Sequence, residues 1–215
     1  AVHGNAACVR LLCQHNIPVD QQTYKSGDTA LSLVLASFVA ANTMPVPGLY
    51  EAEKHARADK KRRARNAGLE EVVVTLLQLG ADPSTPRPSA TPLHIASHRG
   101  FDSAVRLLLS GRYYHVNDYG ERVTPSVEAV DAFQRTPLHR ASTSGHGDVA
   151  TTLLGCGADP LARDKSGKSS LQVGIELGRD AVVRSGLNIW CRESYAGVSV
   201  SMHEMMRRVQ LMQEE

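Results

Sequence analysis

Two near-copies of one six-residue phrase constrain the fold of this chain more than any other feature. They are Thr91-Pro92-Leu93-His94-Ile95-Ala96 and Thr136-Pro137-Leu138-His139-Arg140-Ala141. Threonine is a favourable residue just before a helix, and proline is favoured at the first helical position. The leucine then points into the core, and the histidine can bridge backbone groups through its two ring nitrogens. The phrase therefore predicts a repeated helix start, with His94 and His139 in structural rather than catalytic or metal-binding roles.

The residues after each copy of the phrase predict a complete repeating unit. After the two phrases come Gly100 with an apolar run over 104–109, and Gly145 with apolar residues over 149–158. The next opening, Ser169, lies 33 residues after Thr136. These motifs and this period resemble the ankyrin-repeat family, in which each unit is a helix, a tight turn, a second helix and a projecting β-hairpin. The resemblance implies an all-α repeat fold, an ankyrin solenoid of about five helix–turn–helix repeats with projecting β-hairpin loops. In this fold we expect Leu107 and Leu153 in the core.

Weaker copies at the same offsets extend the array over residues 1–186. Thr29 to Thr91 is 62 residues and Thr91 to Thr136 is 45, so both intervals exceed one period and predict inserted loops. The chain opens inside a unit, and we expect it to be part of a longer protein. The expected units are a partial repeat at 1–22, a repeat at 23–85 with an insertion at about 40–67, a repeat at 86–130 with an extended hairpin, a repeat at 131–163 and a degenerate terminal repeat at 164–186.

The first insertion concentrates positive charge. The whole chain has a formal net charge of +2, but residues 54–65 hold seven Lys and Arg against one Asp. The composition favours a helix without an apolar stripe, which cannot bury itself in a stack. Three interpretations remain open: a solvated, partly disordered loop, a dock for an acidic partner, RNA or a tubulin-like surface, and a nuclear-import signal. Its candidate binding residues are Lys60, Lys61, Arg62, Arg63 and Arg65.

Two further segments are candidates for contacts outside the array. Three of the six tyrosines lie in one seven-residue stretch of the extended hairpin, residues 113–119. Tyrosine and arginine are favoured at interface hot spots, so this hairpin either binds a partner or folds back to cover the next repeat. Residues 187–215 are expected to form an irregular segment and a C-terminal amphipathic helix with a methionine-rich stripe. That helix either caps the last repeat or meets a partner helix.

Motif content argues against several classes of function. No apolar run approaches the roughly 18 residues of a membrane span. The four cysteines form no CxxC pair and no zinc-finger spacing, which favours free thiols in the reducing interior of a cell. There is no phosphate-loop pattern and no arrangement of Ser, His and acid that could be argued as catalytic. We expect no enzyme activity, no cofactor and no metal, and a cytoplasmic protein, with a nuclear location left open by Lys60 to Arg63.

The family resemblance implies a non-catalytic protein–protein interaction scaffold or adaptor within an intracellular assembly. Partners of ankyrin proteins usually meet the hairpin tips and the exposed face of the first helices. The tip candidates are Tyr24, Lys25, Arg87, Tyr113, Tyr114, Tyr119, Arg122, Arg163 and Lys165. The first-helix candidates are Ile95, His98, Arg99, Arg140 and Thr143. Two alternatives remain: a polyanion or nucleic-acid tether that uses the basic insertion 54–65, and a substrate-targeting module of a larger enzyme.

Overall fold

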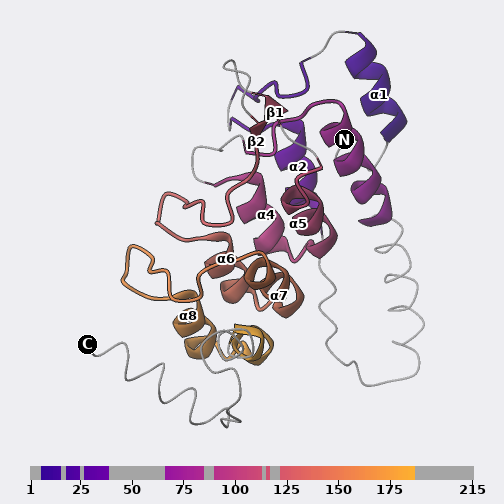
Figure 1. Ribbon diagram of the computed structural model, residues 1–215. Helices are drawn as coiled ribbons and strands as arrows, with labels where there is room; N and C mark the ends of the chain where they lie inside the picture. Colours follow the sequence, from indigo (N-terminus) through magenta and orange to yellow (C-terminus); the bar gives the residue numbers. More distant parts are fainter. Residues whose placement is uncertain are drawn as a thin grey trace, which may run out of the picture.

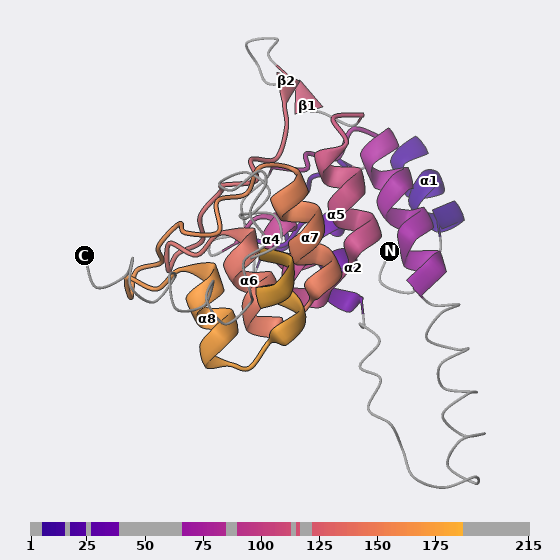
Figure 2. The same ribbon diagram turned by 60° about the horizontal axis from the view of Figure 1, so that its bottom comes forward.

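The computed structural model describes residues 6–15, 18–24, 27–38, 66–84, 90–112, 115–116 and 122–186. Short helices succeed one another along a stack in the order of the sequence (Figures 1 and 2). The first helices of the units are α2 (Ala30–Ser37), α4 (Pro92–Arg99), α6 (Pro137–Ser144) and α8 (Ser170–Glu176). The second helices are α1 (Ala6–Gln14), a helix over residues 66–78, α5 (Asp102–Leu109), α7 (Gly147–Gly155) and a helix over residues 180–186.

The helices form two layers. In one layer, α2 packs on α4, α4 on α6 and α6 on α8, while α5 packs on α7 in the other. The helices α4 and α5, and likewise α6 and α7, form pairs that join the layers. Within the described residues, no helix has the length and apolar character needed to cross a membrane.

The repeated phrase begins and ends its helices as predicted. Thr91 and Thr136 precede α4 and α6 in extended conformation, and each helix has its proline in the first turn. Both helices end at a left-handed glycine, Gly100 with φ 73° and Gly145 with φ 80°. A Cβ on Gly100 would also lie only 2.6 Å from the ring of His146. This glycine is therefore required both by its backbone conformation and by the close approach of the next repeat.

The core lies between the two layers and consists mainly of leucine, valine and alanine. Leu93, Phe101, Leu108 and Leu153 have no exposed surface. The expectation that Leu107 is a core residue is wrong, because its side chain is only partly buried at the edge of the core. Counted from Gly100 and Gly145, Leu108 is the counterpart of Leu153, and Leu107 corresponds to Thr152.

A short hairpin extends from the stack after α5. Strand β1 (His115–Val116) pairs antiparallel with β2 (Arg122–Val123), and both stand away from the helix layers at the top of Figure 2. At the other end of the array, the terminal unit still forms a helix pair, in which Val182 and Val183 are buried. The division of the chain into five repeats stays a prediction.

Several expectations concern residues outside the described ranges. These are the basic stretch 54–65 and residues 187–215, together with Lys25, Arg87, Tyr113, Tyr114 and Tyr119. The interpretations offered for them therefore remain predictions.

Candidate functional site

The loop over residues 124–135, here called finger 1, is held by one carboxylate whose side chain is fully buried. Asp131 accepts hydrogen bonds from the backbone N–H groups of Phe133 (2.7 Å) and Arg135 (3.0 Å). Its Oδ2 atom also pairs with Nε of Arg135 (3.2 Å) and with Nη2 of Arg140 (2.6 Å). Burial alone would raise the pKa of this carboxyl, but the backbone hydrogen bonds and the two arginines together lower the pKa below its ordinary value. Finger 1 is thus organised around an ionised aspartate.

The loop over residues 159–168, here called finger 2, repeats this design 33 positions later. Asp164 accepts hydrogen bonds from the backbone N–H groups of Ser166 (2.8 Å) and Lys168 (3.0 Å), and it donates its own N–H to the Lys168 carbonyl (2.9 Å). The two fingers are also joined directly, because the N–H of Lys165 donates to the carbonyl of Phe133 at 3.0 Å. The fingers therefore form one connected backbone surface.

Both fingers expose polar side chains, and finger 1 also exposes large apolar ones while finger 2 exposes cationic ones. Val130 and Phe133 are 58% and 55% exposed, and the guanidinium carbon of Arg135 lies 4.5 Å from the centre of the Phe133 ring. Arg163 and Lys165 are exposed on finger 2. We call these five residues the fingertip surface. Arg163 and Lys165 were predicted from the sequence. The two large apolar residues on either side of Asp131 were not predicted, although Phe133 is the only aromatic residue in the sequence of finger 1 and could have drawn attention to this loop.

The histidines of the repeated phrase connect each helix start to the finger beyond it. Nδ1 of His94 accepts the N–H of Thr91 (3.3 Å), and its Nε2 donates to the carbonyl of Arg135 (2.8 Å). His139 makes the same pair of bonds with Thr136 (3.2 Å) and with the carbonyl of Lys168 (3.1 Å). Only a neutral ring can accept at Nδ1 and donate at Nε2. Burial lowers the pKa of both histidines, which favours this neutral form.

We expect mild acid to destabilise the protein for this reason. Burial also lowers the pKa of His98 and His146, so four histidines in the folded state have pKa values below the ordinary 6.5. The unfolded chain then binds more protons, so stability is fully present above about pH 6.5 and is lost as the pH falls below it. Urea unfolding at pH 7.5 and pH 5.5 measures the difference in the free energy of unfolding between the two pH values. This difference should be smaller in His139→Gln, which lacks one of the four histidines. Equal stability at both pH values would contradict the expectation.

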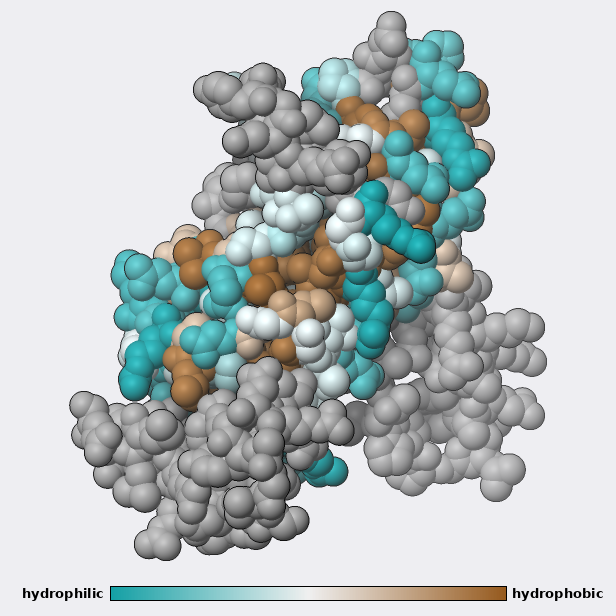
Figure 3. Space-filling view, viewed as in Figure 1, coloured by the Kyte–Doolittle hydropathy of each residue, from teal (hydrophilic) through white to brown (hydrophobic). Residues whose placement is uncertain are grey.

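A groove lies on the first-helix layer. It has a volume of about 190 Å³ and is lined by Ala36, Ala90, His94, Ile95, His98, Arg99 and Arg140. In the view of Figure 3, hydrophobic side chains gather near the centre of the described surface, with hydrophilic ones on either side. Four of the five first-helix candidates therefore line one groove. The fifth, Thr143, turns its hydroxyl back to the carbonyl of His139 in its own helix (2.8 Å).

Two of the groove candidates, Ile95 and Arg140, are less exposed than the sequence analysis expected. Ile95 is only 9% exposed, because α4 is covered by the helices on both sides. The side chain of Arg140 is 21% exposed and bonds to Asp131, so it connects α6 to finger 1. Arg99 is exposed, and His98 is exposed in part, because its Nδ1 atom lies 2.7 Å from the hydroxyl of Ser144 in the next first helix. Of the tip candidates, Tyr24 is fully exposed, and Arg122 lies in β2.

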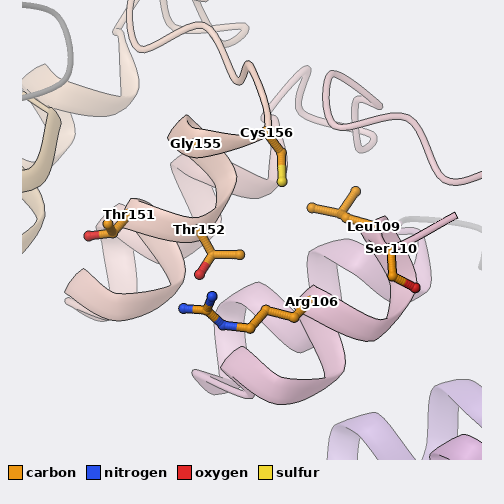
Figure 4. Close-up of a pocket in the computed structure, with 7 residues that line it drawn as sticks. All are labelled: Arg106, Leu109, Ser110, Thr151, Thr152, Gly155 and Cys156. Carbon is orange, nitrogen blue, oxygen red and sulfur yellow. The ribbon is translucent and has the colours of Figure 1, made fainter. Parts of the chain in front are cut away.

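A second hollow, of about 350 Å³, lies between α5 and α7 (Figure 4). Two of its polar side chains, those of Arg106 and Thr152, already bond to the carboxylate of Asp102. Nε of Arg106 pairs with Oδ2 of Asp102 (2.7 Å), and the hydroxyl of Thr152 donates to Oδ1 of the same carboxylate (2.6 Å). Among the residues that the structure describes, no three His, Cys, Asp or Glu side chains are grouped to hold a metal ion. The hollow therefore offers no convergent set of groups for chemistry.

Comparison with known protein families finds that residues 62–164 match the family model for ankyrin repeats (3 copies). The matched range contains the helix over residues 66–78, the helices α4 to α7 and the whole of finger 1.

Proposed function

Because this chain is an ankyrin-repeat protein, we propose that it is a non-catalytic scaffold that binds a partner protein through the fingertip surface. Ankyrin repeats are generally protein–protein interaction modules. The observation that supports this choice of surface is the exposure of Phe133 and Val130 on a loop whose backbone is fixed by Asp131.

Two properties make these side chains suited to a partner. Exposed apolar groups gain free energy when a partner removes them from water. Aromatic and arginine side chains also dominate the binding energy of protein interfaces, and Phe133 with Arg135 supplies both on one loop. Because finger 1 is ordered before binding, little conformational entropy is lost in the complex.

Affinity capture from the cells that make the protein tests this proposal. The full chain is used as bait after nuclease treatment, and wild type is compared with the double variant Val130→Ala and Phe133→Ala. We expect defined proteins to be captured by wild type and reduced at least about 10-fold by the double variant, in line with the loss of one hot-spot residue. Leu177→Ala is a matched control, because Leu177 is also an exposed apolar residue but lies at the end of α8.

The same experiment separates the scaffold from the nucleic-acid tether. Capture that is abolished by nuclease and by replacing Lys60, Lys61, Arg62 and Arg63 with alanine would favour the tether. Capture of the same proteins by wild type and by the double fingertip variant would contradict the fingertip surface.

A further inference from the structure

The size of the groove between α2, α4 and α6 limits what can enter it. Its volume of about 190 Å³ is below the roughly 300–1,000 Å³ of small-molecule sites. A helix with its side chains is roughly 10 Å across, so a whole helix does not fit and only individual side chains of a partner can enter the groove. The groove is large enough for one or two side chains of an extended peptide segment.

The groove is apolar in part and carries excess positive charge. Ala36, Ala90 and Ile95 supply the apolar lining. Arg99 is exposed and makes no ion pair in the described part of the chain. Arg140 shares the single carboxylate of Asp131 with Arg135, so two guanidinium groups are balanced by one negative charge.

Two further observations agree with this excess of charge. Nε of Arg140 is buried and has no hydrogen-bond partner among the described residues, so Asp131 does not satisfy every donor of this guanidinium. The pKa of His98 is lowered first by burial and next by the charges of Arg140 and Arg99. The positive charges of Arg140 and Arg99 therefore add to the effect of burial in opposing protonation of His98.

From this geometry we propose that the groove binds an acidic peptide segment of a partner protein. Arg99 and Arg140 hold a carboxylate of the segment, and a small apolar side chain beside that carboxylate packs against Ala36, Ala90 and Ile95. The inference rests on the proposed scaffold function and adds the chemistry of the partner.

A peptide fits the groove better than a nucleic acid for two reasons. Guanidinium and carboxylate form charge-assisted hydrogen bonds, which are the stronger class. The lining includes no Phe, Tyr or Trp on which a base could stack, although such residues supply much of the affinity for single strands.

A library of random dodecapeptides displayed on phage, selected on the full chain, tests the proposal. We expect the enriched peptides to share an Asp or Glu next to a small apolar residue. Fluorescence anisotropy with the synthetic peptides should show a loss of about 10-fold or more on Arg99→Gln, because a charge-assisted bond is removed. Arg99→Lys should retain most of the affinity. Arg99 is the residue to change because it is exposed, whereas Arg140 also holds Asp131.

Matched variants separate charge from shape. Ala36→Glu introduces a competing carboxylate into the groove lining, while Ala36→Gln introduces the same bulk without the charge. We expect Ala36→Glu to weaken binding more than Ala36→Gln. Arg184→Gln, an exposed position on the helix over residues 180–186, removes the same charge elsewhere and should leave the affinity unchanged.

Several outcomes would overturn the proposal. These are a selection that enriches no acidic peptide, acidic peptides that bind Arg99→Gln as well as wild type, and a fluorescent oligothymidylate that binds with the same dependence on Arg99. If captured proteins are lost with Phe133→Ala but not with Arg99→Gln, the scaffold function stands and the groove proposal fails. If neither Phe133→Ala nor Arg99→Gln reduces the capture of proteins, both proposals fail.

Discussion

Replacing Leu153 with alanine is expected to lower the free energy of unfolding by about 2–5 kcal/mol. The side chain has no exposed surface and lies in α7, where it belongs to the shared core of the stack. The truncation removes buried methyl groups and leaves a cavity that neighbouring helices can fill only in part. Urea unfolding followed by circular dichroism measures the change.

Leu107→Ala is the control for this prediction. It deletes the same atoms from a leucine that is only partly buried in α5, so we expect a clearly smaller loss of stability. Equal losses for the two variants would show that the assignment of Leu108, rather than Leu107, as the counterpart of Leu153 is wrong.

Asp131→Ala is expected to cost about 3–5 kcal/mol, the usual range when one member of a buried ion pair is removed. The carboxylate side chain is fully buried and pairs with two guanidinium groups. It also accepts the N–H groups of Phe133 and Arg135. Its loss leaves all of these donors without an acceptor, and unfolding in urea at neutral pH reports the cost.

Asp131→Asn distinguishes charge from hydrogen bonding. The amide oxygen can still accept a backbone N–H, so the asparagine variant should be intermediate between wild type and alanine. The alanine variant should also be cut faster by trypsin after Arg135, because finger 1 loses the bonds that hold its backbone. Wild-type stability together with wild-type cleavage in Asp131→Ala would refute the role assigned to this carboxylate.

The parts of the fold that obey local rules could be predicted from the sequence. Thr91 and Pro92 predicted a helix start, and Gly100 a helix end, because capping and left-handed conformations depend on a few neighbouring residues. The bridging role of His94 was also predicted, since its two ring nitrogens stand at a fixed offset from the threonine.

The features that depend on neighbouring repeats could not be predicted. Ile95 was expected on an open face, but contacts of α4 with α2 and α6 leave it nearly buried. The register of Leu107 and Leu108 depends on where α5 begins, which the run of three leucines does not specify. The ion pair between Asp131 and Arg140 joins residues nine positions apart, and only the folded loop brings them together.

The bonds from His94 and His139 determine where such a chain could lose a segment without damage. Each histidine lies in one helix, but its carbonyl acceptor lies in the loop that leads to the next first helix. A deletion of residues 137–155 would remove α6, its turn and α7. Finger 1 would then lose its ion pair with Arg140, and finger 2 its hydrogen bond with His139. Excision of residues 136–168 instead would join Arg135 to Ser169 and keep the acceptor of His94 in place. The unit that could be gained or lost during evolution is therefore the interval between two capping residues, not the visible pair of helices.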